Sequence, residues 1–105
     1  MSAVDLGPLS GFQTDAATPA AVDHWRLAVV RIDDDVYVLE DRCSHEDYPL
    51  SCGEVDARTR EIECDRHGAM FDLATGDAVS LPATRPVRSF RADVRDGRVW
   101  VELPS

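Results

Sequence analysis

Two short clusters of the sequence each pair a cysteine with a histidine. The first is Cys43-Ser44-His45 and the second is Cys64-Asp65-Arg66-His67, with 18 residues between His45 and Cys64. Thiolate and imidazole are soft or borderline ligands, and four of them can close a tetrahedral zinc site or hold a two-iron cluster. The sequence therefore predicts a metal centre with four ligands: Cys43, His45, Cys64 and His67.

The spacing alone leaves the identity of the metal open. Structural zinc sites more often use C-x-x-C or H-x-x-x-H pairs, so a C-x-H pair is unusual for them. Iron–sulfur centres in which two histidines replace two cysteines on one iron form a defined class. An iron–sulfur centre, a structural zinc site and a coincidence of spacing all stay open at this point.

Short strands must position these ligands. The apolar, β-branched stretch Trp25–Ile32 and the stretch Val36–Glu40 are separated by three aspartates, which predicts a hairpin. The first Cys–His pair follows this hairpin directly. A second hairpin is predicted around the other pair, with one strand at Glu61–Glu63 and the next at Ala69–Leu73.

The remaining segments also favour strands and turns. We expect an edge strand near Ala3–Leu6, a loop through Gly11–Pro19, and strands at Val87–Val94 and Arg98–Leu103 joined by the turn residues Asp96-Gly97. The two prolines of Ser80–Pro86 exclude a central strand there and predict a rigid loop. No stretch has a sustained helical period. The predicted fold class is all-β, with antiparallel strands and ligand loops at hairpin tips.

Composition limits the classes of function. The chain has 105 residues, which we expect to form one domain (residues 1–105), and its formal charge is −9 with arginine as the only cation besides histidine. The charge is uneven, because residues 1–81 hold 17 acids and 6 arginines whereas residues 82–105 hold 3 acids and 5 arginines. With no basic stripe, nucleic-acid binding is not expected.

The sequence also bears on location and on the residues outside the clusters. It shows no signal-peptide pattern and no apolar run of the length a membrane span needs, so we expect a cytoplasmic protein that does not bind membranes. Three cysteines do not make a secreted disulfide framework. Cys52 has no partner in the second cluster and is expected to be a buried or free thiol, and His24 is expected to be a surface histidine or one with satisfied hydrogen bonds.

A family resemblance narrows the choice of metal. The segments Cys43–Val55 (CSHEDYPLSCGEV) and Cys64–Gly76 (CDRHGAMFDLATG) resemble the two ligand boxes of Rieske-type ferredoxins. The stretch Ser80–Val87 (SLPATRPV) resembles the proline-containing loop that covers the cluster in that family. The resemblance extends over residues 25–103. It implies an antiparallel β-sandwich with a cluster-binding subdomain formed by two hairpin loops.

The resemblance also implies ligand roles. Cys43 and Cys64 would hold one iron of a single [2Fe-2S] cluster, and His45 and His67 would hold the other. High-potential relatives carry a serine and a tyrosine where this chain has Ala69 and Phe71, and their hydroxyl groups stabilise the reduced cluster. We therefore expect a reduction potential in the bottom half of the Rieske range of roughly −150 to +300 mV.

The resemblance implies an electron carrier and not an enzyme. The chain lacks a second site with two histidines and a carboxylate, which oxygenases need to activate oxygen. We expect one-electron transfer from a ferredoxin reductase to a non-haem iron oxygenase, with transient docking of both partners at the His45/His67 tip. The alternatives are a Rieske ferredoxin of iron–sulfur cluster assembly, the small subunit of a nitrite reductase, and a zinc-stapled interaction module.

Overall fold

The fold consists of short antiparallel strands. The computed structural model describes residues 2–44, 48–65, 68–81 and 85–104. Helical structure in these residues is limited to two 3-10 turns, and none of their helices is long and apolar enough to cross a membrane. The elements in chain order are β1 (Ser2–Pro8), η1 (Leu9–Gly11), β2 (Ala16–Val22), β3 (Trp25–Ile32), β4 (Asp35–Glu40), η2 (Leu50–Cys52), β5 (Glu54–Asp56), β6 (Glu61–Glu63), β7 (Met70–Asp72), β8 (Ser89–Phe90), β9 (Ala92–Arg95) and β10 (Arg98–Leu103).

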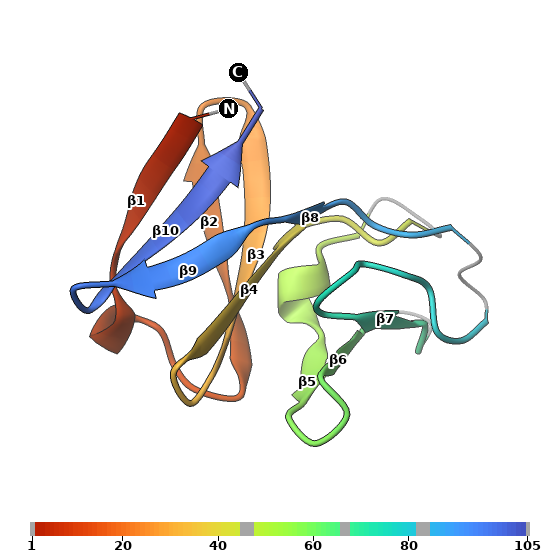
Figure 1. Cartoon of the computed structure of the whole chain (residues 1–105). Helices are drawn as coiled ribbons and strands as arrows, with labels where there is room; N and C mark the ends of the chain where they lie inside the picture. The colour runs from red at the N-terminus through yellow and green to blue at the C-terminus, as the bar shows by residue number, and fades with distance from the viewer. Residues whose placement is uncertain (1, 45–47, 66–67, 82–84, 105) are drawn as a thin grey trace.

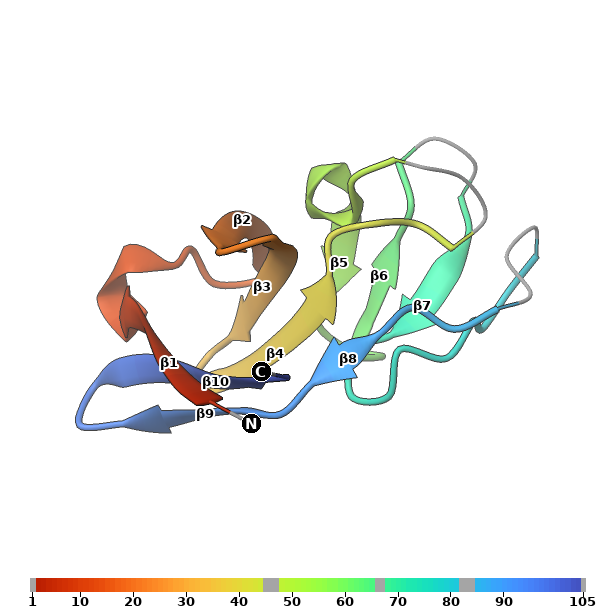
Figure 2. The same cartoon turned by 90° about the horizontal axis from the view of Figure 1, so that it is seen from above.

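The strands form three antiparallel sheets, and the predicted all-β class is confirmed. The sheets have the strand orders β1-β10-β9, β2-β3-β4-β8 and β5-β6-β7. Figures 1 and 2 show the β5–β7 sheet at one end of the molecule, with β1, β9 and β10 toward the other end. The β2-β3-β4-β8 sheet is therefore the middle layer.

Strand β3 explains this layering. Its residues Leu27 and Val29 pack in one core together with Val99 and Val101 of β10. Its alternate residues Ala28 and Val30 pack in the second core, which also contains residues of β6 and β7. A strand that is buried on both faces must be apolar at successive positions, because its side chains alternate between the two faces. This requirement accounts for the unbroken apolar run in the sequence.

Two predicted hairpins are confirmed by their registers. Strands β3 and β4 pair from Leu27↔Glu40 to Ile32↔Asp35, and β9 and β10 pair from Arg98↔Arg95 to Val101↔Ala92. The second turn has positive φ at both central residues, +52° at Asp96 and +73° at Gly97. Positive φ at both positions is typical of the two-residue turns that match the twist of hairpin strands.

Two expectations about the strands are wrong. Residues 16–19 are not loop but belong to β2, a strand of alanines, threonine and a proline that pairs along β3. Proline is tolerated there because β2 is an edge strand. The predicted strand Val87–Val94 is interrupted at Arg91, because β8 pairs with β4 whereas β9 pairs with β10. The chain changes sheets at this point.

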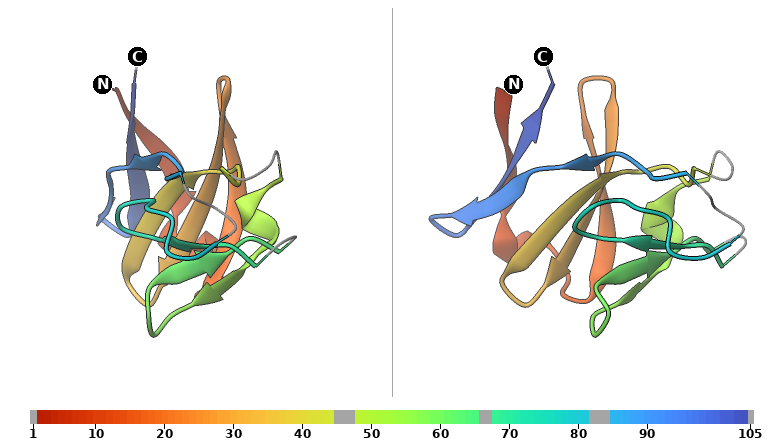
Figure 3. Two further views of the ribbon diagram at one scale, coloured as in Figure 1. Left: turned by 90° about the vertical axis from the view of Figure 1, so that its right-hand side faces the viewer. Right: turned by 45° about the vertical axis from the view of Figure 1, so that its right-hand side comes forward.

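The two ends of the described chain lie together. Strand β1 pairs with β10 in the register Ser2↔Leu103. Figure 3 shows both termini at the end of the molecule away from β5–β7. The β5–β7 sheet therefore lies on the side away from the chain ends.

Candidate metal centre

Cys43 lies at the base of the first ligand loop, three residues after β4. Its side chain is buried, with 1% of the residue exposed. Its amide N–H donates to the carbonyl oxygen of Tyr48 at 2.8 Å, which closes the loop that contains His45. The carboxylate of Asp41 also accepts hydrogen bonds from the amide and the hydroxyl of Ser51, both at 2.7 Å. These bonds fix both flanks of the loop, while His45 itself is outside the described residues.

Cys64 has the same place in the second loop, directly after β6. It is fully buried, and its amide donates to the carbonyl oxygen of Ala69 at 2.7 Å. The Gly68 amide donates back to the Cys64 carbonyl at 2.9 Å, with φ at +74°. Glycine adopts this φ without strain, so it permits the tight turn. His67, the fourth predicted ligand, also lies outside the described residues.

The two cysteines share one apolar core. Both belong to the cluster that contains Leu50, Ala69 and Phe71, each fully buried. Neither forms a disulfide, and the described residues contain none. Two buried thiols at the bases of two closed loops fit a metal centre, because a thiolate is stable in an apolar core only when a cation neutralises it.

No complete ligand set can be assembled from the described part of the chain. Among residues 2–44, 48–65, 68–81 and 85–104, no three histidine, cysteine or acidic side chains gather around one point. The structure thus brings Cys43 and Cys64 into one core and leaves the roles of all four ligands as predictions.

Gly53 brings the two ligand segments into contact. It follows η2 and precedes β5, and a Cβ atom added there would overlap the carbonyl oxygen of Glu63, the residue before Cys64. Its φ of −85° is an ordinary value, so glycine is needed here for space and not for conformational freedom. The close approach of the Glu63 carbonyl therefore explains the glycine of the Gly53-Glu54-Val55 motif.

The segment that contains Ser80 and Arg85 is tied to both loops. The Ser44 hydroxyl donates to the Arg85 carbonyl at 2.5 Å, so this side chain anchors the first loop. The Met70 amide donates to the Ser80 hydroxyl at 3.1 Å, and the Val79 amide donates to the Met70 carbonyl at 2.8 Å. Consistent with the predicted rigid loop, the described residues between 80 and 86 belong to no strand.

Ser44 and Asp41 are site residues that the sequence reasoning missed, since a single serine or aspartate beside a ligand carries no distinctive pattern.

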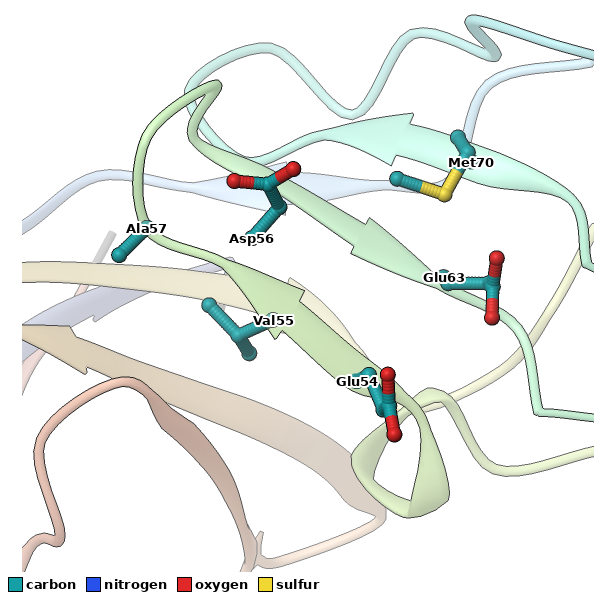
Figure 4. A pocket seen from close by; sticks show the side chains of 6 residues that line it. All are labelled: Glu54, Val55, Asp56, Ala57, Glu63 and Met70. Carbon is teal, nitrogen blue, oxygen red and sulfur yellow. The ribbon is translucent and has the colours of Figure 1, made fainter.

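The outer face of the β5–β7 sheet is acidic. Glu54 lies opposite Glu63 in the register, and Asp56 lies opposite Glu61. Figure 4 shows Glu54, Asp56 and Glu63 around one surface pocket. The backbone amides of Thr59, most strongly, and Arg58 hold the pKa of Asp56 below its ordinary value against the opposing effect of burial. Like charges placed opposite one another disfavour pairing, so this face lowers the stability of the sheet.

Residues outside the loops match most expectations. Cys52 is an exposed free thiol, and His24 is exposed in the turn before β3, where its ring lies 4.9 Å from that of Trp25. The large exposed apolar side chains among the described residues are Val79 and Leu81, at 51% and 76% exposure. Both lie in the segment beside the ligand loops.

A family model for the Rieske [2Fe-2S] domain matches residues 3–91. The chain belongs to the Rieske [2Fe-2S] family. Its cofactor is one [2Fe-2S] cluster, so the zinc-stapled module is no longer an alternative.

Several similar proteins are ferredoxins. Ferredoxin CarAc of Metapseudomonas resinovorans is 41% identical over 75 residues, which cover 71% of this chain and 68% of the relative. The ferredoxin of carbazole 1,9a-dioxygenase from Nocardioides aromaticivorans IC177 has a TM-score of 0.94 and 32% identity, covering 99% of this chain and 100% of that one. A chain in a complex of reduced oxygenase and oxidised ferredoxin in carbazole 1,9a-dioxygenase has a TM-score of 0.85 and 34% identity, covering 94% and 100%.

The steric role of Gly53 can be tested with alanine. Gly53→Ala forces apart two backbone segments, and overpacking of this kind costs about 1–3 kcal/mol. We expect the free energy of unfolding to fall by that amount and the purified protein to retain less iron. Gly11→Ala is the matched control, because its Cβ would meet only Pro8, at 3.8 Å. Equal stability of the two variants in denaturant unfolding would contradict the close approach.

Proposed function

We propose that this Rieske protein carries single electrons from a ferredoxin reductase to the terminal non-haem iron oxygenase of a ring-hydroxylating system, and is not itself catalytic. The observation that carries the proposal is the match along nearly the whole chain to a ferredoxin of carbazole 1,9a-dioxygenase. Ferredoxin CarAc and the ferredoxin of carbazole 1,9a-dioxygenase are named as ferredoxins and not as catalytic oxygenases. This favours the oxygenase system over cluster assembly and nitrite reduction.

The ligand assignment is part of the proposal. Cys43 and Cys64 would hold one iron, and His45 and His67 the other. A [2Fe-2S] centre supplies a one-electron couple when it is bound. Burial of the two thiols together in one apolar core supports the cysteine half of this assignment.

The described residues protect and position such a site. The side chains of Leu50 and Phe71 exclude water from the cysteine side, since both are fully buried. The hydrogen bonds at Cys43, Cys64 and Ser44 hold the three surrounding segments together. A site held in this way limits rearrangement between oxidation states.

The partner contacts and the compartment complete the proposal. We expect the reductase and the oxygenase to dock in turn at the His45/His67 tip, with Val79 and Leu81 beside it as apolar contacts. Docking of this type is transient and buries a modest area. Cys43, Cys52 and Cys64 form no disulfide, which suits the reducing cytoplasm.

Removal of one cysteine ligand tests the assignment. Cys64→Ala should abolish the visible absorbance of the cluster and lower the melting temperature, because metal binding contributes to folding. Cys52→Ala is the control, since this thiol is exposed, and it should keep the iron and sulfide content of the wild type. Full absorbance and an unchanged melting temperature in Cys64→Ala would show that the site is elsewhere.

The reduction potential tests the environment of the site. Ala69 and Phe71 are fully buried in the core of the cysteines and carry no hydroxyl group. We expect a midpoint in the lower half of the Rieske range, and voltammetry above about +150 mV would contradict this. Ala69→Ser should raise the midpoint by about 40 mV if its hydroxyl bond strengthens by about 1 kcal/mol on reduction. Ala57→Ser, in the turn at the far end of β6, should leave the midpoint unchanged.

Electron delivery can be measured directly. The protein is reduced with dithionite, freed of excess reductant and mixed anaerobically with the oxidised oxygenase component of a carbazole 1,9a-dioxygenase. We expect the visible bands of the oxidised protein to return within seconds and the oxygenase to gain one electron for each protein oxidised. Reoxidation no faster than in buffer alone would count against the carrier role.

A further inference from the structure

A groove lined by arginines lies beside the first ligand loop. It is formed by the end of β4 and the segment that leads into β8, and its volume is about 230 Å³. The side chains that line it include three arginines and one acid: Arg42, Arg85, Arg88 and Glu40. Ser44, which precedes His45, lies at the same groove. The groove therefore adjoins the predicted site of electron exchange.

Hydrogen bonds to two backbone carbonyls hold both walls of the groove. At one end the Glu40 amide donates to the Arg88 carbonyl at 2.8 Å. At the other end the Ser44 hydroxyl donates to the Arg85 carbonyl at 2.5 Å. Because these hydrogen bonds join the two segments at both ends of the groove, the distance between the segments does not depend on a bound partner.

Arg88 is held in place by aromatic rings. Its guanidinium carbon lies 5.0 Å from the ring centre of Trp25 and 5.6 Å from that of Phe90. Those two rings pack edge to face, with their centres 5.3 Å apart. A stacked guanidinium loses little freedom when it binds a carboxylate, and its N–H groups fit the two carboxylate oxygens. Arg88 is exposed at the surface, so a partner can reach it.

The charge of the groove contrasts with the charge of the chain. The protein has a formal charge of −9, and one face of the β5–β7 sheet pairs acid with acid. Arginine is concentrated in residues 82–105, and the groove uses two arginines of that stretch, Arg85 and Arg88. An acidic segment would be repelled by most of this surface and attracted here. Such a pattern fixes the orientation of docking more than its strength.

We propose that this arginine groove binds an acidic segment of the redox partner and thereby sets the orientation in which the first ligand loop meets it. The inference rests on the proposed electron-carrier function, and it adds a second contact with its own chemistry. Carboxylates of the partner pair with Arg85 and Arg88, while the tip of the ligand loops faces the electron acceptor or donor.

Equilibrium binding of a hexaglutamate peptide tests the groove without electron transfer. The oxidised holoprotein is titrated calorimetrically at an ionic strength of about 20 mM, with hexaglutamine as the uncharged probe. We expect saturable binding of hexaglutamate alone, with affinity that falls as salt increases because screening shortens the range of charge attraction. Absence of saturable binding, or equal binding of hexaglutamine, would overturn the proposal.

A pair of double variants with the same net charge identifies the site. Arg85→Gln with Arg88→Gln should weaken hexaglutamate binding at least tenfold. Arg58→Gln with Arg95→Gln removes two exposed arginines outside the groove and should change the affinity less than twofold. Arg85→Gln alone leaves the Arg88 stack intact and should still weaken binding at least threefold. Equal losses in the two double variants would show a general charge effect and refute the groove.

The outcomes for the groove and for the carrier role are separable. The visible spectrum and the reduction by dithionite report an intact centre in each variant. A protein that delivers electrons to an oxygenase but does not bind hexaglutamate refutes only the groove. A protein that binds hexaglutamate at Arg85 and Arg88 but never exchanges electrons with an oxygenase refutes only the carrier role.

Discussion

Burial of two cysteine side chains in one apolar core is the constraint on which this structure depends. Cys43 and Cys64 come from different hairpins, yet both are sealed from solvent against Leu50 and Phe71. A neutral thiol would be stable there. In addition to this packing, each cysteine closes a loop through a hydrogen bond donated by its backbone amide. This arrangement fits the assignment of the chain to the Rieske [2Fe-2S] family.

The middle sheet connects this site to the rest of the molecule. Because β3 contributes alternate residues to two cores, a change in the sandwich formed with β10 is transmitted to the layer that holds the cysteines. Dense cores transmit strain instead of absorbing it. The ligand loops are therefore supported by a rigid base and not by their own short strands, which have only three residues each.

Much of this could be predicted from the sequence, and the failures have physical causes. The β3–β4 and β9–β10 hairpins followed from a continuous apolar run and from the Asp96-Gly97 turn. Strand β2 was missed because its alanines and Pro19 have low strand propensity, and pairing along β3 decides its conformation. The break at Arg91 was missed because nothing local marks a strand that changes sheets. That Cys43 and Cys64 lie in one core was predictable from their spacing, whereas the hydrogen bonds of Ser44 and Asp41 depend on segments that only folding brings together.

The neighbouring chain ends have a practical consequence. Since Ser2 and Leu103 are register partners on the side away from β5–β7, anything attached to either end is held clear of the ligand loops. A tag or a flexible tether at either terminus could attach the protein to an electrode so that the end with the β5–β7 sheet faces the solution. A short peptide linker between the two ends would allow a circular permutation, with the new termini placed in the Asp33-Asp34 turn.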